Sequence, residues 1–273
     1  MNYPAGSPRS PAGLEGIPTM TATSTNYWPD ARCAKAFWSQ HELPPYQELL
    51  RDTSAWLEPA IGQRWLDLGC GSGQLSRVLW EKSQGKIEAV VGVDVAGVNE
   101  RSYAILRAAL QPAPTPMCVR FVARDFTQGF ADWPGEQFDG VVSGLALQYA
   151  ESYADDGGGW NETAYDRVLS EVYRLVKRGG VFVFSVNVPN PAWSRLAWQS
   201  LAAAVRKKQP LRYLKKAWRM WTYGNWLTRE SRRGRFHYLP LETIVEKLLT
   251  VGFIDIEDRV SYAGQAYLVR CRK

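Results

Sequence analysis

A short run of glycines directly after a buried-strand pattern constrains the fold of this chain more than any other feature. Trp65–Leu68 has the apolar character of a buried strand, Gly69, Gly71 and Gly73 follow it, and a helix begins near Gln74. Glycine permits so sharp a turn, and the free N–H groups at a helix start favour an anionic group. A dinucleotide-binding fingerprint places its third glycine at the sixth position, which is Gln74 here. The spacing therefore favours a different ligand.

Further buried-strand patterns follow along the chain, and several end in a polar or glycine-containing segment. Ala89–Asp94 ends in a carboxylate, which can accept both hydroxyls of a ribose. A third strand pattern, Val119–Ala123, leads into Asp125-Phe126. A fourth, Phe138–Gly144, is followed by a loop. The last segment, Leu175–Phe184, contains a helix end, a glycine turn and a strand. Strand patterns that alternate with helical ones predict a parallel sheet with helices on both faces.

The arrangement Asp67-x-Gly69-x-Gly71-x-Gly73, together with these segments in this order, resembles the class I S-adenosylmethionine (SAM) methyltransferases. The similarity is greatest to bacterial small-molecule methyltransferases of the ubiquinone- and menaquinone-biosynthesis type. It implies an α/β, Rossmann-like fold with a seven-stranded, mostly parallel sheet of order 3-2-1-4-5-7-6, and SAM as the cofactor. An NAD-dependent oxidoreductase is a disfavoured alternative, because Gln74 replaces the sixth-position glycine.

The resemblance also implies which residues contact SAM. The glycine loop passes under its methionyl part, the second strand ends at its ribose, the third strand ends at its adenine, and a backbone carbonyl after the fourth strand holds its ammonium group. The residues at these positions are Asp67, Gly69, Cys70, Gly71 and Gly73, then Asp94 and Val95, then Asp125 and Phe126, and last Ser143 and Gly144.

Catalytic residues are less evident. Related enzymes often carry a histidine in the loop after the fourth strand, where this chain has Gln148. Tyr149 could orient a substrate, and His237 could reach the pocket from the point where an insert rejoins the fold. We take Gln148, Tyr149 and His237 as the catalytic candidates, with packing roles as the alternative for each. The missing base leaves a SAM-binding protein without catalysis as a second hypothesis.

The patterns divide the chain into five parts. We expect a disordered tail over residues 1–25, a helical lid over 26–60, the SAM-binding core over 61–189, a cap insert over 190–236, and a helix with strands that complete the sheet over 237–273. A helix over 161–176 is expected to start at Asn161 and to be closed by Gly179. A second helix is expected to run from Pro240 to Gly252.

The insert is strongly basic and rich in tryptophan. From Ser194 to Arg235 it holds twelve Lys and Arg residues against Glu230 alone, so its net charge is +11 while the whole chain carries +6. On a helix, Leu211, Leu214, Trp218 and Trp221 share one stripe beside basic residues, as in helices that lie on membranes. A cap over the substrate pocket, contact with an anionic membrane surface, and nucleic-acid binding all remain open, the last being the least favoured.

Composition limits the remaining possibilities. The four cysteines form no C-x-x-C pair and there are two histidines, so we expect neither a disulfide framework nor a metal site. No apolar run approaches the ~20 residues that span a bilayer, so we expect a cytoplasmic protein that can be peripheral on the membrane. Leu43-Pro44-Pro45-Tyr46 lacks the polar first residue of a base-methylating loop, and we expect Pro44 to start a helix. The methyl acceptor and the oligomeric state are not evident from the sequence.

Overall fold

The computed structural model describes residues 43–154, 158–195 and 210–273, and over 210–220 it describes the backbone alone. Seven strands in this part of the chain form one sheet of order β3-β2-β1-β4-β5-β7-β6. Pairing is parallel from β3 to β5, while β7 is antiparallel to both β5 and β6. This is the predicted order with one reversed strand. The strands are β1 (Arg64–Leu68), β2 (Ala89–Asp94), β3 (Val119–Ala123), β4 (Phe138–Gly144), β5 (Val176–Asn187), β6 (Ile254–Ser261) and β7 (Ala266–Arg272).

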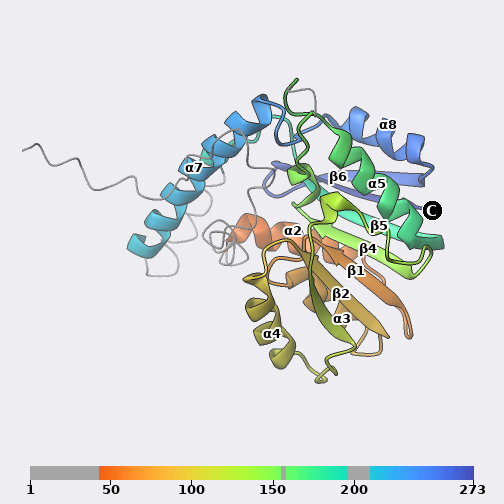
Figure 1. The fold of residues 1–273 in the computed structure, drawn as a ribbon. Helices are drawn as coiled ribbons and strands as arrows, with labels where there is room; N and C mark the ends of the chain where they lie inside the picture. Colours follow the sequence, from red (N-terminus) through yellow and green to blue (C-terminus); the bar gives the residue numbers. More distant parts are fainter. Residues whose placement is uncertain (1–42, 155–157, 196–209) are drawn as a thin grey trace, which may run out of the picture.

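Helices cover both faces of the sheet (Figure 1). One face carries α2 (Pro44–Trp56), α3 (Gln74–Lys82) and α4 (Asn99–Ala109), and the other carries α5 (Thr163–Leu175) and α8 (Leu241–Val251). A long helix, α7 (Pro210–Arg232), extends beyond the sheet (Figure 1). Two short 3-10 turns, η2 (Phe126–Gln128) and η3 (Leu147–Tyr149), follow β3 and β4.

Each layer of helices buries its apolar face against the sheet. On one side Leu79 and Tyr103 pack against strand residues such as Val90. On the other side Val172 and Leu248 pack with residues such as Phe182. Burial on both faces explains why the central strands are continuous apolar runs.

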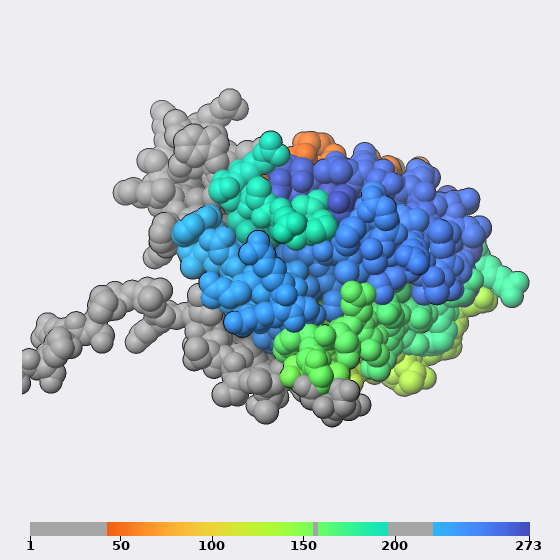
Figure 2. All heavy atoms as spheres, turned by 90° about the horizontal axis from the view of Figure 1, so that it is seen from above, coloured from red at the N-terminus to blue at the C-terminus, as the bar shows by residue number. Residues whose placement is uncertain are grey.

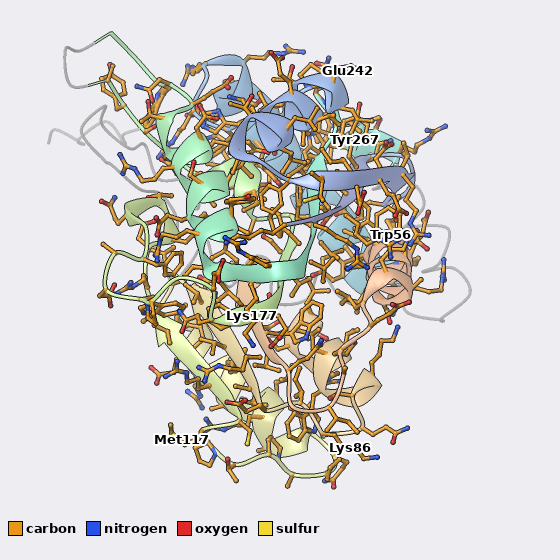
Figure 3. All side chains as sticks on the ribbon, turned by 90° about the vertical axis from the view of Figure 1, so that its right-hand side faces the viewer. Trp56, Lys86, Met117, Lys177, Glu242 and Tyr267 are labelled. Atoms are coloured by element: carbon orange, nitrogen blue, oxygen red, sulfur yellow. The ribbon has the colours of Figure 1, made fainter. Side chains whose placement is uncertain are left out.

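The parallel strands bring distant polar residues to one edge of the sheet. Asp67 of β1 pairs in register with Gly92 of β2, and Gly144 of β4 pairs with Ser185 of β5. The carboxyl ends of β1, β2, β4 and β5 therefore lie together, which is where ligands bind in open α/β sheets. At the opposite end of β5, Lys177 forms an ion pair with Asp139 at 2.9 Å, and it is labelled in Figure 3.

Most helix boundaries follow the sequence signals, although α5 starts at Thr163, with Glu162 at its N-cap, and not at Asn161. Pro44 starts α2, and Gly252 ends α8 in the left-handed conformation, as predicted. The prediction that Gly179 closes α5 is wrong, because α5 ends at Leu175 and the chain enters β5 at once. Gly179 instead has φ 74° inside an irregular stretch of β5, and its N–H donates to the carbonyl of Lys273 at 2.8 Å.

Some expectations concern residues outside the described ranges. They are the disordered tail over 1–25, the part of the predicted lid that precedes residue 43, and the part of the cap over 196–209. The side chains of Leu211, Leu214 and Trp218, which form most of the predicted apolar stripe, also lie outside the description.

Candidate functional site

A cavity with an empty volume of about 1120 Å³, part of it open to solvent, lies at the carboxyl ends of β1, β2, β4 and β5. Its wall is formed by residues of the glycine loop, the strand ends, α2, α7 and the loop before β7. The lining residues are Tyr46, Gly69, Cys70, Gly71, Ser72, Gln74, Asp94, Val95, Ala96, Asn99, Asp125, Phe126, Thr127, Gly144, Leu145, Ala146, Tyr149, Asn187, Trp193, Leu227 and Tyr262.

The glycine loop lies directly against this cavity. Gly69, Gly71 and Gly73 all have positive φ, at 71°, 51° and 83°, a region that other residues seldom adopt. A side chain at Gly73 would collide with the ring of Tyr103, at 2.8 Å. At Gly71, in contrast, an added Cβ would meet nothing within 4 Å. The loop therefore leaves open space for a ligand directly above Gly71.

Asp94 links the end of β2 to the glycine loop. Its Oδ2 accepts the N–H of Gly71 at 2.9 Å, and its Oδ1 accepts the N–H of Ala96 at 2.8 Å. Burial raises the pKa of Asp94, and these two hydrogen bonds oppose the rise. Each carboxylate oxygen has a further lone pair, so Asp94 can also accept hydroxyl groups from a ligand in the cavity.

Asp67 lies beneath the loop and does not line the cavity. Its Oδ2 accepts both the N–H of Ser76 at 2.9 Å and the hydroxyl of Ser76 at 2.6 Å, and Tyr103 donates to the same hydroxyl. Burial raises the pKa of Asp67 to about 7, although both hydrogen bonds from Ser76 lower it. Asp67 therefore ties the first turn of α3 to β1.

The third strand ends at the cavity wall. Asp125 caps η2, because its Oδ1 accepts the N–H of Thr127 at 2.9 Å and the Thr127 hydroxyl at 2.7 Å. Phe126, the next residue, is buried with its ring at the wall. A carboxylate beside an apolar ring suits a flat heterocycle that carries an amino group.

The fourth strand ends in strained backbone. The hydroxyl of Ser143 donates to the carbonyl of Leu68 at 2.7 Å, which joins β4 to β1 below the cavity. Gly144 lines the cavity, and Leu145 follows with φ 52°. The N–H of Leu145 donates to the carbonyl of Ser185 at 3.0 Å, and its carbonyl accepts the side chain of Gln148. Such strain in a non-glycine residue is characteristic of functional sites.

The other half of the cavity is largely aromatic. Tyr46 comes from α2, Tyr149 from η3, Trp193 from the segment after β5, and Tyr262 from the turn between β6 and β7. Leu227 of α7 completes this wall. Sequence reasoning did not single these residues out as site residues, Tyr149 excepted, because no local pattern shows that five separate segments converge.

Asn187 was also missed. It is the last residue of β5, is 2% exposed and lines the cavity. The available signal was its position, since it is a polar residue at the end of an apolar strand pattern, as Asp94 is.

The three catalytic candidates lie in different places. Tyr149 lines the cavity, and its hydroxyl lies 3.3 Å from that of Tyr238. Gln148 and His237 do not line it: Gln148 is fully buried, and His237 Nε2 lies 2.9 Å from the carbonyl of Ala150. Burial also lowers the pKa of His237. Neither side chain lines the cavity, and the catalytic roles of Gln148 and His237 stay predictions.

The segment after β5 and the end of α7 pack against each other over the cavity. Figure 2 shows the residues around 188–195 in contact with the described part of α7 and with the C-terminal strands. The indole of Trp193 lies so close to Gly224 that any side chain there would collide with it, and Trp193 Nε1 donates to Thr228 at 2.7 Å. The two ends of the insert are therefore packed against each other.

One arginine of the basic insert is not a surface charge. Arg235 is buried, its Nε donates to Glu151 at 2.8 Å, and its guanidinium lies 3.5 Å from Glu230 and over the ring of Trp160. This finding corrects the sequence-based view of Arg235 as part of the basic surface. Arg229 and Arg232 are exposed on α7.

The charges of the lining residues suit SAM. The acidic lining residues are Asp94 and Asp125, and no Lys, Arg or His from the described residues lines the cavity. A pyrophosphate would meet no cationic side chain among them, whereas a sulfonium ligand carries the complementary charge. Together with the open space over Gly71, the residues present fit the cofactor. The described residues also contain no group of His, Cys, Asp and Glu arranged to hold a metal ion.

Comparisons with known proteins agree with this geometry. Residues 66–184 match the family model described as "Methyltransferase domain". No curated protein matches the chain significantly.

Solved structures share the fold at low identity. A SAM-dependent methyltransferase from Mesorhizobium loti has a TM-score of 0.51 and 22% identity, with 82% of this chain and 96% of that chain covered. The N-methyltransferase NodS from Bradyrhizobium japonicum, solved with S-adenosylhomocysteine (SAH), has a TM-score of 0.54 and 15% identity, with coverage of 86% and 91%.

A chain from the complex of the Haloferax volcanii methyltransferase activator Trm112 with a methyltransferase has a TM-score of 0.56 and 16% identity, with coverage of 88% and 92%. The family model and the sheet order agree. Residues 66–184 therefore form a class I methyltransferase domain, and the chain is a SAM-dependent methyltransferase.

Proposed function

We propose that this enzyme methylates a small molecule with a flat apolar part, which binds beneath α7. A single observation carries this proposal. One cavity joins an acidic half, with Asp94 and Asp125, to an aromatic half, with Tyr46, Trp193 and Tyr262. The acidic half suits a cationic cofactor, and the aromatic half suits the face of a planar acceptor.

The proposed roles of the cofactor-side residues follow from their positions. Asp94, beside Val95, accepts the ribose hydroxyls; Asp125 and Phe126 take the adenine; and the backbone at Gly144 takes the ammonium group. Gly69, Cys70 and Gly71 form the floor, and Asp67, Gly73 and Ser143 support that floor from below. SAM supplies a methyl group on a positively charged sulfur. The chain contributes alignment of the two substrates and exclusion of water.

The acceptor class can be tested with SAM that carries a labelled methyl group. The protein is incubated with a cell extract that is afterwards separated into small molecules, lipids, nucleic acid and protein. We expect the label among small molecules or lipids. Label in RNA or protein alone would contradict the proposed acceptor class. Binding of SAM without labelling of any fraction would favour the non-catalytic alternative.

We also propose that the outer face of α7 contacts anionic membrane, which would bring a lipophilic acceptor to the cavity. Trp221 is 40% exposed, and Arg229 and Arg232 are exposed on the same helix. Tryptophan beside arginine suits the boundary between headgroups and acyl chains. None of the helices in the described ranges has the length and apolar content to cross a membrane. Flotation with anionic vesicles but not with neutral ones would support surface contact, and equal flotation with both would contradict it.

A further inference from the structure

Asn187 stands out in the aromatic half of the cavity because its side-chain oxygen has no partner. The residue is 2% exposed and lines the cavity, yet Oδ1 makes no hydrogen bond with any described residue. A buried amide oxygen without a hydrogen-bond partner is unfavourable, so its presence at a cavity wall indicates a ligand that donates a hydrogen bond to it.

The surroundings of Asn187 fix the orientation of its amide. Burial raises the pKa of both Tyr149 and Tyr238, and a smaller opposing effect on each pKa comes from a side-chain hydrogen bond with Asn187. The two hydroxyls also lie 3.3 Å apart. The amide nitrogen is therefore engaged with the tyrosine pair, which leaves Oδ1 as the group available to a ligand. An amide oxygen only accepts hydrogen bonds, so the ligand must present an N–H or O–H.

The ionisable groups of the cavity wall indicate whether the methyl acceptor is an amine or a hydroxyl. Asp94 and Asp125 both accept backbone N–H groups in the acidic half. In the aromatic half, burial raises the pKa of Tyr46 to about 12 and also raises that of Tyr149, so both phenols stay protonated. The described lining residues of that half also include no carboxylate or imidazole that could act as a general base. A hydroxyl acceptor needs such a base, whereas a neutral amine already has a lone pair.

We propose that Asn187 is the acceptor-positioning residue and that the acceptor is a neutral amine on a flat apolar molecule. This inference rests on the proposed function. Asn187 Oδ1 accepts one N–H and thereby directs the nitrogen lone pair toward the acidic half of the cavity. The nitrogen forms the new N–C bond, the carbon–sulfur bond breaks with its electron pair on sulfur, and the surplus proton on nitrogen leaves to water.

Three probes of matched shape test this inference: 4-methylaniline, 4-methylphenol and 1,4-dimethylbenzene, which differ only in an NH₂, OH or CH₃ group. Their binding to the SAH-loaded protein is measured by ligand-observed NMR. We expect the amine to bind about three- to tenfold more tightly than the hydrocarbon, as one neutral hydrogen bond provides. Asn187→Leu should abolish this preference, and Asn187→Asp, which retains acceptor oxygens, should keep it.

The affinity for SAH is measured first in each variant. Absence of SAH binding to the wild type would contradict the proposed function itself, which separates that failure from failure of this inference. Equal binding of amine and hydrocarbon to the wild type would overturn the inference, as would a preference that survives in Asn187→Leu. If Asn187→Leu does not fold, loss of the preference in Asn187→Asp overturns it. With SAM, methylation of 4-methylphenol in place of 4-methylaniline would overturn the choice of nitrogen.

Discussion

The carboxylate of Asp94 accepts the backbone N–H of Gly71 at 2.9 Å, and this contact joins two parts of the cavity wall that come from different strands. The glycine loop after β1 and the acid at the end of β2 therefore act as one structural unit. Because the unit holds the loop in its left-handed conformation, changes at either residue affect the loop and the ligand together.

Gly71→Ala is expected to weaken SAH binding by about tenfold or more, which corresponds to at least ~1.4 kcal/mol. The added methyl group would enter the open space above the loop, and alanine at φ 51° would cost about 1–2 kcal/mol of stability. Gly62→Ala is the matched control, since Gly62 has φ 77° and open space but lies outside the cavity. Calorimetric titration distinguishes the two. Equal SAH affinities in both variants would contradict a ligand above Gly71.

Asp94→Ala is expected to weaken SAH binding by roughly 10- to 150-fold, because hydrogen bonds to a charged group contribute about 1.5–3 kcal/mol. The change removes the acceptor for the Gly71 N–H and for the proposed ribose hydroxyls. Asp132→Ala serves as the control, since Asp132 is an exposed acid paired with Arg124 away from the cavity. Unchanged affinity in Asp94→Ala would show that the end of β2 does not contact the ligand.

The strands were predictable from the sequence because burial on both faces leaves a plain signal. β2 and β3 begin and end at the predicted residues, and β4 begins at Phe138. Gly252 predicted the helix end reliably, because glycine is the residue type that readily adopts φ 112°. Gly179 carried the same signal but lies inside β5, because Val176, directly after α5, already pairs with Phe138 of β4.

The side-chain environments were less predictable, because they depend on contacts between distant segments. Asp67 and Asp94 both follow apolar strand residues, yet Asp67 bonds Ser76 below the loop and Asp94 lines the cavity. Arg235 reads as one charge of a basic run, but its partner Glu151 is 84 residues away in the sequence. The proposed role of Asn187 depends on its hydrogen bonds with Tyr149 and Tyr238, and no local sequence pattern connects these residues.

Asp67→Asn should change how stability depends on pH. Burial raises the pKa of Asp67 from 3.8 to about 7, so the folded protein favours its protonated form. Protonated Asp67 therefore adds to the free energy of unfolding. This stabilisation is fully present below pH 4 and is lost as the pH rises through 7, by up to about 4 kcal/mol. Asparagine keeps an acceptor for Ser76 and does not titrate. Relative to the variant, the wild type should therefore lose stability between pH 4 and pH 8 in urea unfolding. Parallel stability curves would contradict the raised pKa.

Arg235→Met should destabilise the protein by about 3–5 kcal/mol, because it removes the buried ion pair between Arg235 and Glu151. The double variant Arg235→Met/Glu151→Gln should recover part of the loss, since it also removes the buried charge of Glu151. Arg232→Met is the control at an exposed position and should change stability by no more than about 0.5 kcal/mol. If Arg235→Met were as stable as Arg232→Met in urea unfolding, the buried ion pair would not hold the end of α7.

The most direct test of the central claim is a calorimetric titration of the wild-type protein with SAH and, separately, with NADH. The acidic lining and the open glycine loop predict saturable binding of SAH in the micromolar range, and no binding of NADH under the same conditions. Binding of NADH without binding of SAH would contradict the assignment of this cavity to a sulfonium nucleoside.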